Sequence, residues 1–296
     1  MLIVCAACYV SAHATRANDQ QVDARLGLTV IDLKAKTEYH LFNPTPRELM
    51  RELSTDRPDK TESPYTVDAG HFQIESDLAS FSYDAFNGDP TDTTTESWSF
   101  ANTNFKVGLL NNVDLQVVVS TFNHVRTEDR TFDIAEESSG FGDVVTRLKI
   151  NLWGNDGGQT ALALMPFVKF PTSQQDLGND AVEGGLIVPL AIALPAEWQM
   201  GLMTQFDFNR DGSGSGYHTE FINTVTLSHD IVGDLAGYVE FFSAVSTEDE
   251  SDWVGTVDLG LTYGLTADIQ LDAGVNVGVT RAADDVNPFV GATWRF

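Results

Sequence analysis

Charged residues that could act on a small molecule alternate with apolar residues along several segments of the chain. In residues 267–280 a polar residue or glycine alternates with Ile, Leu, Ala or Val over six successive pairs. Because successive side chains of a strand point to opposite faces, one face is apolar and the other carries the charges. The predicted polar faces hold the bases Lys106, Arg147, Lys149 and Lys169 and the acids Glu75, Asp77, Asp207, Glu220, Glu240, Asp258, Asp268 and Asp272.

These charges would form two walls if the strands enclosed a bore. The bases fall on the second, fourth and fifth predicted strands, and the acids fall on the first and on the seventh to eleventh. Opposite walls of this kind create a transverse field that orients dipolar solutes, here with a weak preference for cations. Alternatively, the charges pair across neighbouring strands and fill the bore, as side chains do in small barrels. The sequence leaves both interpretations open.

The histidines do not form a catalytic pattern. The sequence contains neither a Gly-x-Ser-x-Gly nucleophile elbow nor a His-Glu-x-x-His motif. His218 shares a predicted strand with Ser228 and Glu220, but ten residues of strand span roughly 33 Å, so His218 and Ser228 do not touch. We therefore predict no enzyme activity, no catalytic residue, no metal and no cofactor.

Acidic clusters also lie between the alternating segments, at residues 128–129, 133–137 and 247–252. Their oxygen atoms suit Ca²⁺ or Mg²⁺, but their spacing matches no EF-hand, which favours solvated loops. Residues 212–216, Gly-Ser-Gly-Ser-Gly, are predicted to be a flexible loop tip and not a phosphate loop, because no lysine follows them.

Twelve strands of about ten residues are predicted from residue 70 onward, joined by connections that alternate in length. The short connections are 110–113, 154–158, 195–197, 230–234 and 264–266, and the long ones are 84–95, 125–141, 171–182, 210–216, 247–252 and 281–285. Membrane barrels have short turns at one end and long loops at the other. The sequence thus predicts an all-β fold, a membrane-spanning, antiparallel, up-and-down β-barrel with a short N-terminal extension. A soluble β-sandwich, whose strands average about five or six residues, is the alternative.

The chain ends in a strand that finishes on an aromatic residue. Apolar residues occupy alternate positions from Val290 to Trp294 and Phe296, a pattern typical of the insertion signal of membrane barrels. All five tryptophans lie near predicted strand ends, as in interfacial aromatic girdles. We expect this last strand to pair antiparallel with residues 70–83 and to close the barrel.

Composition and the N-terminal residues indicate which partners and which cellular location the protein has. The chain has 43 acidic and 17 basic residues, a net charge of −26, which disfavours nucleic acid as a partner. It has no run of about 18 apolar residues that would form a transmembrane helix. Residues 1–14 are predicted to be a signal peptide that contains both cysteines, Cys5 and Cys8, although it lacks a basic start.

The next segment, residues 15–69, is predicted to be periplasmic. It contains one expected short helix within residues 41–53, with Thr45 as its cap, Pro46 at its first position and Glu48 three residues after the cap. Residues 70–296 are predicted to form the barrel.

Three stretches resemble the MetA-pathway-of-phenol-degradation family of outer-membrane transporters. They are residues 54–78, which begin Ser-Thr-Asp-Arg-Pro-Asp-Lys, residues 139–149 with Gly-Phe-Gly-Asp, and residues 163–172 with Pro-Phe-Val-Lys-Phe-Pro-Thr. The resemblance runs from about residue 54 to the C-terminus. It implies a barrel in the bacterial outer membrane and the passage of aromatic or other small organic molecules.

The combined prediction is an outer-membrane channel or transporter for small, aromatic or hydrophobic organic molecules, acting by passive diffusion. Its expected partners are outer-membrane lipid, lipopolysaccharide, the barrel-assembly machinery and a small-molecule solute. The alternatives are a non-conducting structural or adhesive barrel and, third, a barrel enzyme acting on lipid. Entry of residues 15–69 into the bore would exclude free diffusion.

Overall fold

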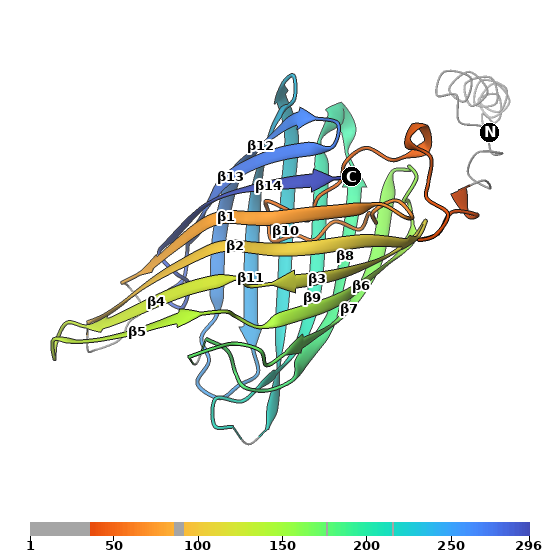
Figure 1. Cartoon of the computed structure of the whole chain (residues 1–296). Coiled ribbons are helices and arrows are strands. Elements are labelled where there is room, and N and C mark those ends of the chain that lie inside the picture. Colours follow the sequence, from red (N-terminus) through yellow and green to blue (C-terminus); the bar gives the residue numbers. More distant parts are fainter. Residues whose placement is uncertain (1–35, 86–91, 176, 215) are drawn as a thin grey trace, which may run out of the picture.

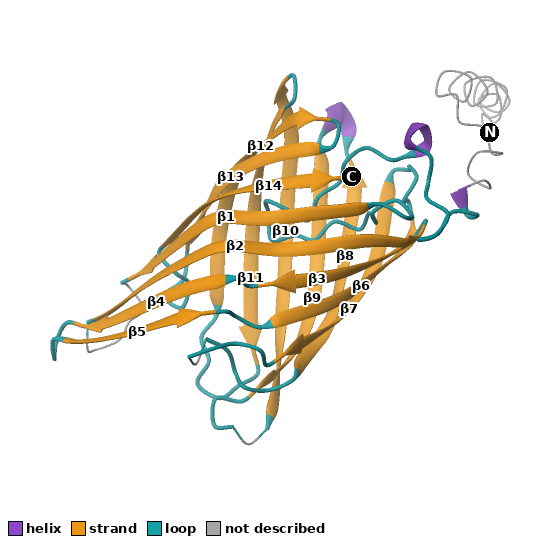
Figure 2. Cartoon of the chain, viewed as in Figure 1, coloured by secondary structure: helices purple, strands orange, loops and turns teal. Residues whose placement is uncertain are grey.

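The computed structural model describes residues 36–296 except 86–91, 176 and 215. Within these residues a single antiparallel sheet closes into a barrel, as Figures 1 and 2 show. Its strands are β1 Phe72–Asp84, β2 Thr93–Leu110, β3 Val113–Val119, β4 Phe122–Asp129, β5 Ile134–Gly140, β6 Val144–Trp153, β7 Thr160–Phe170, β8 Glu183–Ala193, β9 Gln199–Arg210, β10 Tyr217–Val232, β11 Leu235–Ser246, β12 Val254–Thr266, β13 Ile269–Gly278 and β14 Val286–Arg295.

The first and last strands close the barrel. β14 pairs antiparallel with β1, with Arg295 opposite Gln73 and Val286 opposite Tyr83. The backbone N–H groups of Phe72 and Phe296 each donate to the other residue's carbonyl, at 3.0 and 2.9 Å. The predicted pairing of the C-terminal segment with residues 70–83 is therefore confirmed.

The fourteen strands of the described chain make a barrel of twelve. β3 and β4 continue one another along β2 in a single register, with Val119 opposite Thr103 and Phe122 opposite Phe100. β5 and β6 likewise continue one another along β4 and β3, across a break at residues 141–143. The predicted twelve-stranded barrel is confirmed.

The prediction of a loop at residues 125–141 was wrong, because most of these residues form a β-hairpin. β4 and β5 pair with each other, from Asn123 opposite Gly140 to Asp129 opposite Ile134, and this hairpin projects beyond the barrel wall in Figure 1. Most of β5 is exposed on both faces. Since no face of it contacts lipid or core, its sequence lacks the apolar alternation that marks the other strands.

The connections sort by length to the two ends of the barrel, as predicted. We call the end with the short connections, such as residues 111–112 and 233–234, the turn end, and the opposite end, with residues 171–182 and 247–253, the loop end. Phe296 lies at the turn end (Figure 1).

The outer wall is apolar. Its large residues are half-exposed, including the five tryptophans Trp98, Trp153, Trp198, Trp253 and Trp294 at 41–56%. An exposed apolar surface that surrounds the whole molecule is unusual for a protein in water and suits the hydrocarbon of a bilayer. No helix among the described residues is long and apolar enough to cross a membrane.

The predicted N-terminal helix is reduced to a single turn. Only Arg47–Leu49 forms a 3-10 turn, η1, which follows Pro46 and has no side-chain cap. The buried hydroxyl of Thr45 makes no hydrogen bond, so its predicted role as a cap was wrong. Backbone hydrogen bonds hold this stretch in place instead, from Thr45 to Ala69, which precedes β1, and from Leu41 to Leu109 in β2. A second 3-10 turn, η2 (Pro195–Glu197), joins β8 and β9.

Candidate functional site

Residues 54–69 occupy the bore, and we call them the lumen segment. Asp56 contacts β2 and β6, whereas Lys60 contacts β11 and β12 on another part of the wall. Thr61 reaches β10, and the backbone N–H of Val67 donates to Asp114 on β3 at 3.0 Å. A segment that contacts this many strands from within fills the middle of the barrel.

Two acidic residues of the lumen segment, Asp56 and Glu62, face the basic wall. The Asp56 carboxylate lies 2.5 Å from Nζ of Lys106 and 2.6 Å from Nζ of Lys149, and all three side chains are at least 95% buried. Glu62 pairs with Arg147 at 2.5 Å. The attraction within ion pairs shielded from water is screened less than in exposed pairs, so removing one partner of such a pair is costly.

The basic residues of the lumen segment face the acidic wall. The Arg57 guanidinium bridges Asp77 and Asp272, at 2.5 and 2.6 Å. Nζ of Lys60 lies 3.2 Å from a carboxylate oxygen of Asp258, which is fully buried. Glu240 accepts hydrogen bonds from the backbone N–H of Lys60 at 2.8 Å and from the Thr61 hydroxyl at 2.5 Å.

Two aromatic rings on the acidic side also contact these cations. Nζ of Lys60 lies 4.3 Å from the centre of the Phe242 ring, and the Arg57 guanidinium lies 5.8 Å from that of Phe289. Both distances are within the range of cation–π attraction. Gly291 on β14 makes this position of Arg57 possible, because a Cβ at residue 291 would overlap the guanidinium.

Eight of the twelve charged residues predicted to share the polar faces contact the lumen segment: Lys106, Arg147, Lys149, Glu75, Asp77, Glu240, Asp258 and Asp272. The structure does not bring the other four to it. Lys169 pairs with Glu183 and lies 3.7 Å from Asp143, Asp207 accepts from Gln205, Glu220 accepts from Asn209, and Asp268 lies in a turn beside Arg295. The role of all twelve in selecting a solute stays a prediction.

The wall residues Asp114 and Gln116 and the charges of the lumen segment itself were not predicted from the sequence. Asp114 and Gln116 are fully buried and alternate with Val and Leu in β3, so the same period of two could have identified them. The lumen segment has no such period, because an irregular chain presents its side chains in all directions.

Burial and neighbouring charges set the ionisation of the lumen segment. Burial raises the pKa of Asp56, but the charges of Lys106 and Lys149 outweigh this effect and hold it far below its usual value. Burial and the nearby Glu240 raise the pKa of Asp59 well above its usual value. Burial raises the pKa of Glu62 to about 6, against the opposing charge of Arg147. Asp56 is therefore held in its anionic form, whereas the neutral form of Asp59 is favoured.

The lumen segment lies between two cavities. A cavity of about 790 Å³ on the turn side is bounded by Leu53, Thr61, Gln199 and Ser228. A cavity of about 290 Å³ on the loop side is bounded by Arg57, Ser80 and Asn276. The lumen segment thus separates the spaces through which a solute would approach from either end.

An apolar outer wall, a charged bore and a C-terminal strand that closes the sheet define a transmembrane β-barrel of the bacterial outer membrane. The chain belongs to the family described as "Putative MetA-pathway of phenol degradation", which matches residues 55–296. The family match therefore includes almost all of the lumen segment. No curated protein is similar enough in sequence to match.

Solved structures share the architecture. The COG4313 outer membrane channel from Pseudomonas putida F1 is similar with a TM-score of 0.55 at 15% identity, over 82% of this chain and all of that one. The NanC porin (TM-score 0.46, 12% identity, 75% of this chain and 98% of that one) and the KdgM porin (0.45, 8%, 76% and 99%) are also similar. At 15% identity the likeness to the Pseudomonas putida channel supports the fold alone.

Proposed function

We propose that this protein is a non-enzymatic outer-membrane channel for small organic molecules and that the lumen segment is its gate. The observation that carries the proposal is the match between the lumen segment and both walls of the bore. Asp56 and Glu62 pair with bases, and Arg57 and Lys60 pair with acids. Withdrawal of the lumen segment would join the two cavities and let a solute diffuse passively down its gradient.

The solute is a small molecule that combines an aromatic ring with a polar or charged group. Lys106 and Lys149 would attract an anionic or electron-rich group, and the rings of Phe242 and Phe289 would contact an aromatic solute once Lys60 and Arg57 had left. The family's link to phenol degradation supports an aromatic solute, and the similar Pseudomonas putida protein is itself described as an outer membrane channel.

The turn end faces the periplasm in this proposal, as short turns do in outer-membrane barrels. The stretch before the lumen segment then rests at the periplasmic rim, where Arg51 contacts Asp156 and Asn111. The proposed signal peptide, residues 1–14, lies outside the described residues. Lipopolysaccharide and the barrel-assembly machinery remain predicted partners.

A disulfide between the lumen segment and β10 tests the gate. The hydroxyl oxygens of Thr61 and Thr224 are 2.5 Å apart, so the pair Thr61→Cys and Thr224→Cys can form one when Cys5 and Cys8 are replaced by serine. Uptake of phenol and benzoate into proteoliposomes is measured before and after reduction. We expect uptake only in the reduced protein, and unchanged uptake by a Thr61→Cys single variant under both conditions.

Equal uptake by the oxidised and reduced double variant would show that the lumen segment is not the gate. A non-conducting structural barrel is the second candidate, favoured by the ion pairs that occupy the bore and by the projecting β4–β5 hairpin. Absence of uptake even after deletion of residues 54–63, in a barrel that still folds, would support that candidate.

A further inference from the structure

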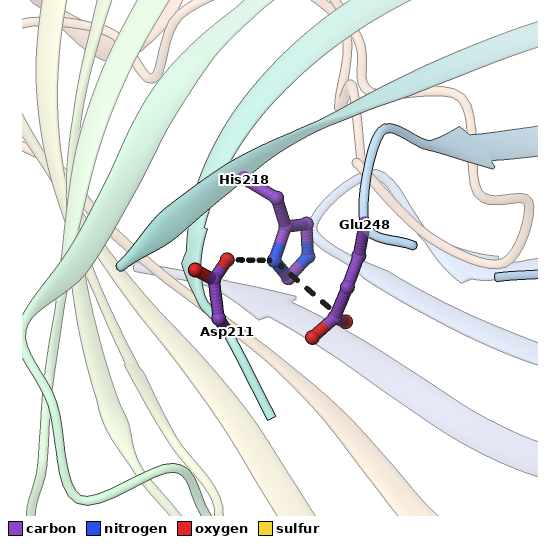
Figure 3. Close-up of side chains that lie close together, drawn as sticks. All are labelled: Asp211, His218 and Glu248. Carbon is purple, nitrogen blue, oxygen red and sulfur yellow. Dashed lines mark hydrogen bonds and ion pairs between the residues drawn. The ribbon is translucent and has the colours of Figure 1, made fainter. Parts of the chain in front are cut away.

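Three potential metal ligands meet at the loop end of the barrel. Asp211 follows β9, His218 is the second residue of β10, and Glu248 follows β11. Figure 3 shows the imidazole of His218 between the two carboxylates, which come from two different loops. His218 lies on the same face of β10 as the buried Thr224 and Thr226, so the group borders the mouth of the bore.

The separations between the three ligand atoms fit one small cation. Nδ1 of His218 lies 3.1 Å from Oδ1 of Asp211 and 3.7 Å from Oε2 of Glu248, and one atom from each residue lies within 4.8 Å of the others. A tetrahedral zinc ion with bonds of about 2.0–2.2 Å holds its ligands about 3.4 Å apart. The two separations from His218 bracket this value, and the two carboxylates lie within 4.8 Å of each other, so side-chain rotations could bring all three ligands onto one ion.

The carboxylates are held in place by groups other than the histidine. The backbone N–H of Gly212 donates to Oε1 of Glu248 at 2.6 Å, which leaves Oε2 directed at His218. The Glu248 N–H in turn donates to the Ser246 hydroxyl at 3.0 Å. The backbone N–H of Asp211 donates to the carbonyl of Gly216 at 3.1 Å, which holds together the two ends of the connection between β9 and β10.

The three side chains combine partial shielding with access from solvent. Their exposed fractions are 12% for His218, 26% for Asp211 and 35% for Glu248. An imidazole nitrogen and carboxylate oxygens are both ligands that zinc accepts, whereas Ca²⁺ and Mg²⁺ take oxygen ligands alone. Three protein ligands also leave a fourth position for water.

We propose that Asp211, His218 and Glu248 bind one divalent transition-metal ion of the zinc type. The ion joins the connection after β9 to the connection after β11, and so fixes one side of the mouth of the barrel. In its absence a hydrogen bond between Nδ1 of His218 and Asp211, with Glu248 close by, accounts for the same contacts. The two arrangements differ in a measurable way, because only the first binds metal.

Calorimetric titration with Zn²⁺ at neutral pH tests the proposal. The protein is the full-length chain in detergent, without a histidine tag and with Cys5→Ser and Cys8→Ser in every variant. We expect one Zn²⁺ per chain, at least about tenfold weaker binding in His218→Ala and Glu248→Gln, and unchanged binding in the control His124→Ala. His124 lies on β4 and contacts Ser139.

Protection of the two loops from proteolysis provides a second measurement. Zn²⁺ should slow cleavage within residues 211–217 and 247–253 of the wild-type protein, and a chelator should reverse this effect. The proposal is overturned if Zn²⁺ does not saturate a single site below millimolar concentration, if His218→Ala binds as tightly as wild type, or if equimolar Ca²⁺ displaces the ion. Heat-modifiable migration on a gel verifies that each variant is a folded barrel.

Discussion

Replacing Asp56 by asparagine removes the charge that joins the lumen segment to the basic wall. The side chain keeps its shape and still accepts from the backbone N–H of Ser63, at 2.9 Å in the wild-type protein. Lys106 and Lys149, however, lose a carboxylate at 2.5 and 2.6 Å. Removing one partner of a buried ion pair costs about 3–5 kcal/mol.

The lower end of this range applies to Asp56→Asn. Lys106 keeps its contact with Glu75, and Lys149 keeps the Tyr65 carbonyl at 3.3 Å, so neither ammonium group is left without a partner. A cost of about 3 kcal/mol shifts the ratio of withdrawn to inserted lumen segment by about a hundredfold, since each 1.4 kcal/mol is a factor of ten.

The open fraction of single channels in planar bilayers measures this ratio. We expect Asp56→Asn to raise it by about a hundredfold, or to saturation if the wild-type channel already opens often. Asp59→Asn is the matched control. Burial and Glu240 raise the pKa of Asp59 well above its usual value, so an amide there changes the charge of the bore less than an amide at Asp56.

Equal open fractions of Asp56→Asn and the wild-type protein, with both migrating as folded, heat-modifiable barrels, would refute this account of the gate. An Asp59→Asn channel that opens as much as Asp56→Asn would refute it equally, because loss of packing and not loss of charge would then be the cause.

Three further predictions concern the gate and the closing strand. Burial raises the pKa of Glu62 from 4.5 to about 6, against the charge of Arg147, so the inserted lumen segment binds the proton more tightly than the withdrawn one. The stability that this proton adds to the inserted state is full below about pH 4.5 and is lost as the pH rises through about 6. The open fraction should therefore increase on the order of tenfold from pH 5 to pH 7, and a decrease, or an equal change in Glu62→Gln, would contradict this. Gly291→Ala should displace Arg57 from Asp77 and Asp272 and raise conductance. The control Gly264→Ala, whose new Cβ would lie 3.6 Å from the Cβ of Asp234, should leave conductance unchanged. Equal conductance of the two variants would exclude this role for Gly291. Phe296→Ala removes the ring stacked on Phe72 at 5.9 Å and should lower the yield of heat-modifiable barrel severalfold, so an unchanged yield would argue against an insertion signal at Phe296.

The barrel could be predicted from the sequence because lipid imposes a simple rule on every strand. In β13 Leu271 and Val277 are exposed to the outside, whereas Asp272, one position from Leu271, is buried. This period of two can be read within each strand, without knowing which strands pair or in which register. The β4–β5 hairpin escaped prediction because it projects beyond the region where lipid imposes that rule.

The lumen segment could not be predicted because its contacts are neither local nor periodic. Asp56 meets Lys149, which is 93 residues away, and Arg57 meets Asp272, which is 215 residues away. Nothing in a run of Asp, Arg, Pro, Asp and Lys distinguishes a solvated linker from a segment that inserts into a barrel. The polar wall was visible in the sequence, but the residues that neutralise it were not.

The occupied bore also bears on the two arrangements of wall charges that were expected from the sequence. Open walls with a transverse field and charges that pair across neighbouring strands were the two expected arrangements. The structure shows part of the second, since Lys106 contacts Glu75 and Lys169 contacts Glu183 on neighbouring strands, but a separate segment also pairs with both walls. Buried charges without partners are costly, so the walls need an occupant. When Asp56 and Arg57 leave, water or a solute must solvate Lys149 and Asp272 in their place. A solute that supplies complementary groups lowers the cost of opening, whereas a purely apolar solute does not. Selection by such a gate would therefore depend on the arrangement of charge in the solute more than on its size.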